Sequence, residues 1–172
     1  QGLLQADQSF EGVGQAFNLA YQAPTALFHD GTTHKSASGC RQGCVLGSFL
    51  FALTIQKVLE SVAAEFGGII HVKAFLDDIT IAFDPAQATL VRLAIEKLES
   101  RLTPLGLRLN STKCHYLAPT ALAPLQALGF THNPSSIKVL GAFIGSPEAV
   151  TSLLMEKVHQ HKSFFDALTH AD

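Results

Sequence analysis

In residues 74–83, AFLDDITIAF, the adjacent acids Asp77 and Asp78 interrupt an apolar run. The β-branched and aromatic residues on either side predict strands over residues 69–74 and 79–83, joined by a tight turn at Leu76-Asp77-Asp78. We therefore expect both carboxylates at the tip of a hairpin whose body lies in the core. Two like charges in apolar surroundings are costly unless something positive compensates them.

Helices are predicted on both sides of this hairpin. Apolar residues at helical spacing predict a long helix over residues 46–66, ended by Gly67 and Gly68. After the hairpin, Asp84 is the expected N-cap of a second helix, with Pro85 in its first turn. The expected apolar face of that helix consists of Leu90, Val91, Ala94, Ile95, Leu98 and Leu102.

The rest of the chain predicts shorter elements. We expect a helix over residues 1–22, a hairpin or loop over 23–39 with its turn at 29–31, strands at 107–109 and 115–117, and a short helix within 119–129. A hairpin around Gly141 and a final helix over 146–170 complete the chain. This order predicts an α+β fold with a mostly antiparallel sheet.

The composition indicates a globular domain with a hydrophobic core. The chain has 172 residues, of which 47% are hydrophobic and 15% charged, and this excludes a disordered tail. No apolar run approaches the roughly 20 residues of a membrane span, so we expect no membrane partner. The chain opens with Gln1 and shows no signal peptide, so we expect an intracellular protein, in the cytoplasm or nucleus, that is part of a longer polypeptide.

The net charge of −2 counts against a nucleic-acid binder that acts alone, because such domains are usually basic. A local groove lined by Lys35, Arg41, Lys73 and Lys113 stays open. Three cysteines, Cys40, Cys44 and Cys114, indicate no disulfide framework, and we expect free, partly buried thiols rather than a zinc site.

The acid pair itself has two interpretations. Adjacent carboxylates at a hairpin tip form an oxygen-rich spot suited to a hard cation such as Mg²⁺, which would relieve their mutual repulsion. The alternative is a solvated turn, where Asp-Asp is common and harmless. The pair alone leaves both open.

Four blocks in order change that balance: GCRQGCVLGSFLFAL at 39–53, AFLDDITI at 74–81, LGLRLNSTKC at 105–114 and IKVLGAFIGSPE at 137–148. Together they resemble the palm of reverse transcriptases, most closely those of retroelements without long terminal repeats. The resemblance covers most of the chain from Tyr21 onward. It implies a polymerase palm, an antiparallel sheet with helices packed on one face, over residues 1–145, and the start of a thumb helix over 146–172.

The resemblance also implies roles for individual residues. Asp77 matches the metal-ligating first aspartate of the family's acid pair, and Asp78 matches its neighbour. Lys113 matches the lysine near the nucleotide's triphosphate, and Leu140-Gly141 matches the hairpin that grips the primer end. Contacts with the incoming nucleotide and the template are implied for Gly39, Arg41, Gln42, Gly43 and Phe75.

The chemistry implied is nucleotidyl transfer from a dNTP to a primer 3′ end, with Mg²⁺ or Mn²⁺ as cofactor and an RNA or DNA template as partner. The family places a further catalytic aspartate on its first palm strand, and this chain has no clear match; Asp7 and Glu11 are the candidate stand-ins. The fingers subdomain is also missing. We therefore expect the chain by itself to be inactive and to need these parts from the longer polypeptide.

Two alternatives to a polymerase fragment remain. One is a catalytically inactive relic of the palm that serves as a nucleic-acid- or protein-binding scaffold. The other is an unrelated α+β domain with a solvated acidic turn, which the four ordered blocks disfavour.

Overall fold

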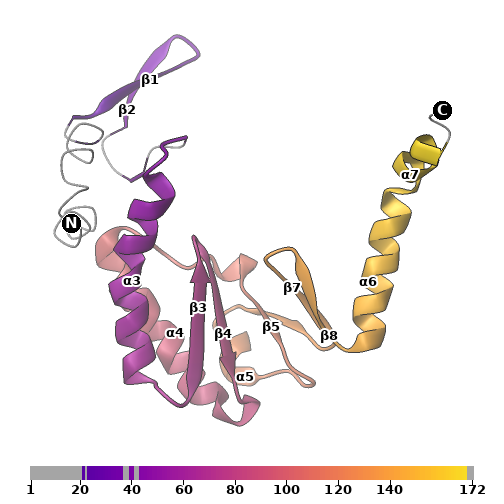
Figure 1. The fold of residues 1–172 in the computed structure, drawn as a ribbon. Helices are drawn as coiled ribbons and strands as arrows, with labels where there is room; N and C mark the ends of the chain where they lie inside the picture. The colour runs from indigo at the N-terminus through magenta and orange to yellow at the C-terminus, as the bar shows by residue number, and fades with distance from the viewer. Residues whose placement is uncertain (1–20, 22, 37–38, 41–42, 170–172) are drawn as a thin grey trace. The chain divides into compact units, whose positions relative to one another are not determined.

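The structure is a computed structural model that describes residues 21, 23–36, 39–40 and 43–169. The chain divides into two compact units (Figure 1). The first comprises Gln1–Ala82 and Ala94–Arg108, and the second comprises Phe83–Leu93 and Leu109–Asp172. The helix expected over residues 1–22 lies almost entirely outside the described residues.

The first unit begins with a hairpin of strands β1 (Thr25–His29) and β2 (Thr32–Ser36), which pair antiparallel. His29 pairs with Thr32, so the turn consists of Asp30 and Gly31 alone. Both turn residues have positive φ, 47° and 72°, the signature of a type I′ turn, for which Asp-Gly is a preferred sequence. The hairpin predicted for this segment is confirmed.

Helix α3 (Gly47–Glu65) follows, and then strands β3 (Ile70–Phe75) and β4 (Asp78–Phe83) form a second hairpin. The helix ends as expected, with Phe66 as C-cap and Gly68 at a φ of 82°. The next helix starts as a short 3₁₀ turn, η1 (Pro85–Gln87), in which the Asp84 carboxylate accepts a hydrogen bond from the Ala86 amide at 2.9 Å. It continues as α4 (Ala88–Leu102).

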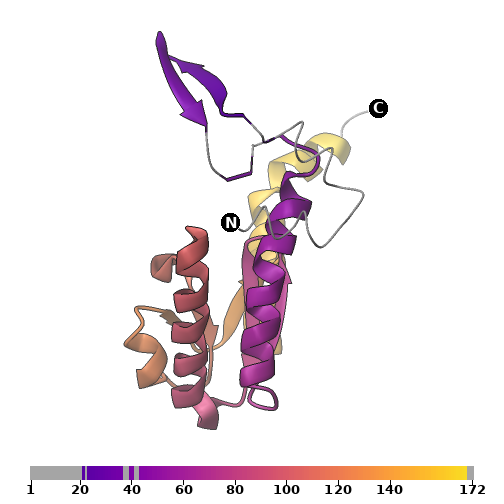
Figure 2. The ribbon, with the colours of Figure 1, turned by 90° about the vertical axis from the view of Figure 1, so that its left-hand side faces the viewer.

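The core of the first unit lies among α3, the C-terminal part of α4 and the start of β3. Figures 1 and 2 both show these two helices side by side. The buried apolar side chains are Leu50, Ile55, Val62, Phe66, Ile70, Ala94, Ile95, Leu98 and Leu102. Of the apolar face predicted for α4, Leu90 is the exception, because 39% of it is exposed.

Helix α3 bears on the prediction that the chain has no membrane span. Its 19 residues, with a mean hydropathy of 1.2, make it long and apolar enough to cross a membrane by length and composition, and 22% of it is buried. Its few polar residues break up the apolar run, so the sequence showed no uninterrupted segment of that length. Core helices of soluble proteins meet the same criteria, so the finding is weak support for a membrane span.

The second unit is built from short elements. The sheet elements are β5 (His115–Leu117), β6 (Thr131–Asn133), β7 (Ser136–Val139) and β8 (Ala142–Gly145). The helical elements are η3 (Ser111–Lys113), α5 (Ala123–Gln126), α6 (Pro147–Gln160) and α7 (Lys162–Thr169). Its buried apolar side chains are Ala88, Val91, Tyr116, Ala118 and Leu125.

The structure confirms an α+β chain with mostly antiparallel strand pairs, but these pairs do not form the single sheet that the sequence predicted. Within the described residues the strands form four two-stranded pairs rather than one sheet. The β5–β6 pair is parallel. Between the two strands the chain passes through α5 and returns to the end at which β5 began, so that β6 runs in the same direction as β5. Residues 107–109 form no strand, and the predicted final helix is divided into α6 and α7 at His161.

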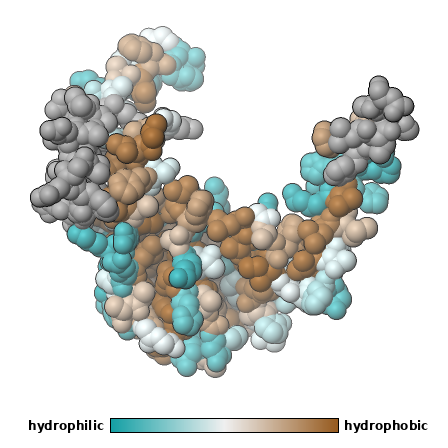
Figure 3. Space-filling view, in the orientation of Figure 1, coloured by the Kyte–Doolittle hydropathy of each residue, from teal (hydrophilic) through white to brown (hydrophobic). Residues whose placement is uncertain are grey.

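Large apolar side chains remain on the surface of both units, and Figure 3 shows them as brown areas among hydrophilic ones. In the first unit they include Phe28, 80% exposed, and Phe75, 62% exposed. In the second they include Met155 and Val158 on α6, 58% and 54% exposed.

Candidate functional site

The two acids lie at the tip of the β3–β4 hairpin, as predicted, but the turn is shorter than expected. It consists of Leu76 and Asp77 alone, and Asp78 is already the first residue of β4. A two-residue connection between paired strands sets Phe75, the last residue of β3, opposite Asp78. The tip therefore brings Phe75, Asp77 and Asp78 together.

The hairpin body is covered on one face, not enclosed in the core as the sequence predicted. Along β4, Ile79, Ile81 and Phe83 are half-buried while the residues between them are exposed. Along β3 only Ile70 is fully buried. The other face carries the side chains of His71, Lys73, Phe75, Asp78 and Thr80, all exposed. An apolar run suggested a strand buried on both faces, but the strands instead form a separate two-stranded pair.

Exposure removes the electrostatic problem that the acid pair posed. Asp77 and Asp78 are both exposed, so neither pays the desolvation cost of a buried charge. Among the described residues, neither carboxylate forms a salt bridge or a side-chain hydrogen bond. Their oxygens are therefore available to a ligand from solution. Lys73, named above among the cations of a possible groove, lies on the same face of the hairpin as Asp78.

Leu76 has a backbone conformation that leucine rarely adopts and that could not be predicted from the sequence. Its φ is 55°, in the left-handed region that side chains other than Gly, Asn and Asp rarely occupy. Residues held in such conformations commonly lie at functional sites, where the surrounding structure compensates a cost of about 1–3 kcal/mol. Here the strained residue directly precedes Asp77 and helps to fix the direction in which the chain presents it.

The glycine loop before α3 is described in part. Gly39 and Gly43 are exposed and have φ values of 78° and 80°, in the left-handed region that glycine adopts without steric strain. Arg41 and Gln42, the two side chains assigned to the nucleotide and the template, lie outside the described residues. The Cys44 carbonyl accepts from the Gly47 amide at 3.0 Å, which connects the loop to the first turn of α3.

Cys40 anchors the other end of this loop. It packs, half-buried, against the fully buried Leu50 of α3. Burial raises the pKa of the Cys40 thiol above its ordinary value, and the neighbouring Cys44 raises it further. All three cysteines are partly buried and outside disulfides, as the sequence predicted.

The remaining predicted site residues belong to the second unit. Lys113 is the exposed last residue of η3, where its amide donates to the Asn110 carbonyl at 2.9 Å. Leu140 and Gly141 form the turn of the antiparallel β7–β8 hairpin, with φ values of 49° and 87°. Positive φ at both positions again indicates a type I′ turn. The hairpin expected around Gly141 is confirmed, and the roles of these residues stay predictions.

The described residues offer some, but not all, of the ligands that a protein metal site needs. Two adjacent, exposed carboxylates offer the hard oxygen ligands that Mg²⁺ and Mn²⁺ prefer. Within the described part of the chain, no group of three or more His, Cys, Asp or Glu side chains is placed to hold a metal. Asp77 and Asp78 alone could offer an ion two protein ligands, and the stand-ins Asp7 and Glu11 lie outside the described residues.

Residues 11–144 match a protein family described as reverse transcriptase (RNA-dependent DNA polymerase). This span includes the glycine loop, the acid pair, Lys113 and the β7–β8 turn. No curated protein and no solved structure matches the chain significantly.

Proposed function

Because the chain belongs to the reverse transcriptase family, we propose that it forms the palm of an RNA-directed DNA polymerase from a retroelement without long terminal repeats. Its reaction is the transfer of a nucleotide from a dNTP to the 3′ end of a primer on an RNA template. The observation that carries this proposal is the tip of the β3–β4 hairpin. There two adjacent carboxylates are exposed and have no protein partner among the described residues.

We assign Asp77 as a ligand of Mg²⁺ or Mn²⁺, with Asp78 beside it. When bound, such an ion supplies positive charge that activates the attacking hydroxyl and neutralises the departing pyrophosphate. The short turn and the conformation of Leu76 support the assignment, because they hold Asp77 at the outermost point of the hairpin. A further carboxylate is needed for two-metal chemistry, and Asp7 and Glu11 remain its candidates.

We assign the other residues on the family resemblance. Gly39, Arg41, Gln42, Gly43 and Phe75 contact the nucleotide or the template, and Leu140-Gly141 contacts the primer end. Lys113 is a cationic side chain, whose charge would offset charge that develops on the leaving pyrophosphate. The protein acts inside the cell, where its template and the dNTPs are.

Calorimetry tests the acid pair directly. Mg²⁺ or Mn²⁺ is titrated into the chain with primer–template and dNTP present, and into the variant Asp77→Asn/Asp78→Asn. Binding heat attributable to the protein should disappear in the double variant. Asp30→Asn is the matched control, because Asp30 is also an exposed carboxylate in a two-residue hairpin turn and should leave the heat unchanged. Equal heats from wild type and the double variant would refute the metal assignment.

A second candidate function is a binding module without catalysis. It is favoured by the finding that the described residues bring no third metal-binding side chain to Asp77 and Asp78. Primer extension separates the two: incorporation of dNTP that Asp77→Asn abolishes identifies a polymerase. Primer–template binding without incorporation identifies the inactive scaffold.

A further inference from the structure

The β1–β2 hairpin is paired along its whole length although the described structure buries almost none of it. Every strand residue is exposed except Thr25 and Ser36, the outermost pair. Two-stranded hairpins that pack on nothing are marginally stable in water. A hairpin with both faces open therefore presents surface that is free to contact a ligand.

The antiparallel register sorts the side chains onto two different faces. Successive residues of a strand point to opposite faces, and paired residues share one. Phe28 pairs with Thr33 and Ala26 with Lys35, so these four residues make up one face, which we call the Phe28 face. The opposite face carries Leu27 paired with His34 and His29 paired with Thr32.

The Phe28 face combines an aromatic ring with a positive charge. Phe28 is 80% exposed, the highest value among the exposed phenylalanines of the described chain. Lys35 lies diagonally across the hairpin, a separation that long side chains can bridge. The face has no acidic residue. The only acid of the hairpin, Asp30, lies in the turn, 3.4 Å from the His29 ring of the opposite face.

We propose that the Phe28 face binds the single-stranded RNA template, with one base stacked on Phe28 and a neighbouring phosphate held by Lys35. Exposed aromatic rings next to cations are the means by which proteins bind single strands without reading their sequence. The inference rests on the proposed function, since it takes RNA as the template. It adds a contact before the glycine loop, in a segment to which the family resemblance assigned no role.

The dimensions of the face favour a nucleic acid over a protein partner. A stable protein interface buries about 800 Å² on each side, whereas one exposed phenylalanine supplies about 150–250 Å². The remaining side chains of the face, Ala26, Thr33 and Lys35, add little apolar area. A second copy of the chain would therefore be held weakly, while one stacked base needs only one ring.

The test is binding of a fluorescein-labelled, unstructured oligoribonucleotide to the whole chain, followed by fluorescence anisotropy without divalent metal or dNTP. Phe28→Ala should weaken binding about 5-fold or more, the effect expected for a lost base–aromatic stack. Leu27→Ala is the matched control, because Leu27 is the neighbouring residue on the opposite face and 53% exposed. It should change the affinity less than 2-fold, on the order of the experimental error.

Three further measurements make the outcome decisive. Phe28→Tyr keeps a ring for stacking and should retain the affinity, which separates stacking from loss of the hairpin. Lys35→Gln should reduce the slope of log affinity against log salt by about 0.7, the value for one phosphate contact on a single strand, and His34→Gln should not. Duplex RNA, whose base faces are covered, should bind wild type and Phe28→Ala equally.

Several results would overturn the inference. One is an equal loss of affinity for single-stranded RNA in Phe28→Ala and Leu27→Ala, and another is an equal loss of affinity of Phe28→Ala for duplex RNA. The others are a loss of affinity in Phe28→Ala for single-stranded DNA but not for RNA, and no binding of RNA by the wild type. None of them alters the calorimetric result at Asp77 and Asp78, so the proposed function can stand while this inference fails. Conversely, an inactive chain that still binds RNA through Phe28 would retain the inference.

Discussion

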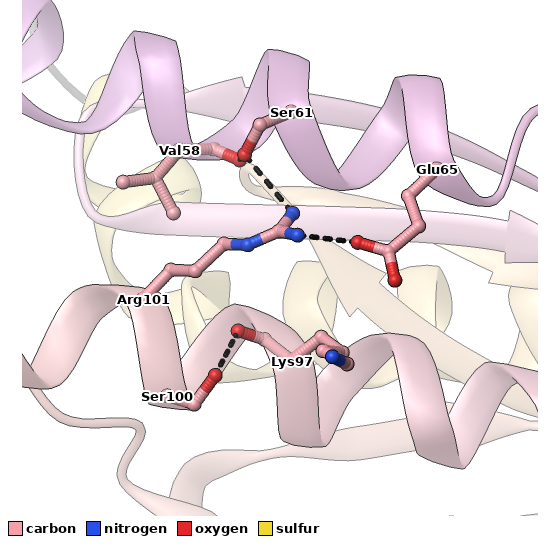
Figure 4. A network of polar contacts seen from close by, with 6 residues as sticks. All are labelled: Val58, Ser61, Glu65, Lys97, Ser100 and Arg101. Atoms are coloured by element: carbon pink, nitrogen blue, oxygen red, sulfur yellow. Dashed lines mark hydrogen bonds and ion pairs between the residues drawn. The ribbon is translucent and has the colours of Figure 1, made fainter.

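Arg101 on α4 donates hydrogen bonds to the Glu65 carboxylate and, at 3.1 Å, to the Ser61 hydroxyl, both on α3 (Figure 4). These residues are 36 and 40 positions apart in the sequence, so the contacts fix one helix against the other. Ser61 in turn donates to the Val58 carbonyl at 2.8 Å, which holds its hydroxyl in place. The network joins the two helices that enclose the core of the first unit.

Breaking this network should lower the free energy of unfolding by a small but measurable amount. The Arg101 and Glu65 side chains are 34% and 38% exposed, and ion pairs that contact solvent contribute about 0.2–1 kcal/mol. A double-mutant cycle of Arg101→Met and Glu65→Gln, measured by urea unfolding, should give a coupling energy in that range that decreases with salt. Lys97→Met, at an exposed position one turn earlier on α4, should lower the free energy of unfolding less than Arg101→Met does. A coupling energy of zero would contradict the contact.

Leu76 should tolerate asparagine better than a β-branched residue. Asparagine adopts positive φ more readily than leucine, so Leu76→Asn should raise the free energy of unfolding by about 0.5–1 kcal/mol. Leu76→Val should lower it by about 1 kcal/mol or more, because β-branched side chains are least compatible with this region. Thermal unfolding of both variants checks the prediction. Stabilisation by valine would show that Leu76 does not have a left-handed backbone.

Gly145 at the end of β8 should be the least replaceable glycine of the described chain. A Cβ atom there would overlap the Ser135 carbonyl and lie 2.6 Å from the Ser136 Cα, and both obstacles are backbone atoms that cannot rotate away. Gly145→Ala should therefore lower stability by about 2 kcal/mol or more, through overpacking and displacement of the paired strand. Gly67→Ala is the control, because its nearest backbone atoms would be 3.5 and 3.6 Å away. Equal effects of the two changes would refute the steric argument.

Cys40 should react slowly with alkylating reagents in the folded protein. Burial and the neighbouring Cys44 both raise its pKa, so at a pH near the ordinary value of about 8.5 less of it is thiolate in the folded chain than in the unfolded one. The raised pKa contributes stability below the unfolded value, and this is lost as the pH rises through the folded value. Peptide mass spectrometry after iodoacetamide treatment, with and without urea, measures the rates. Cys44→Ser should restore part of the reactivity, and no change on unfolding would contradict the pKa direction.

The sequence by itself determined the local structure around the candidate site. Asp30-Gly31 and Gly141 marked two hairpin turns, Asp84-Pro85 marked a helix start, and the glycines after Phe66 ended α3, since each depends on the conformational preferences of a few neighbouring residues. The position of Asp77 at a hairpin tip followed in the same way, and the ordered motifs led to the reverse transcriptase family that the comparison then matched over residues 11–144.

Strand pairing and the covering of strand faces could not be predicted from the sequence and depend on tertiary contacts. The parallel β5–β6 pair, the exposure of Leu90 and the open face of the β3–β4 hairpin depend on residues far apart in the sequence. Apolar strands have the same composition whether one or both of their faces are buried. The positive φ of Leu76 was equally unpredictable, because leucine has no preference for that conformation and adopts it only where paired strands on both sides enforce a two-residue turn.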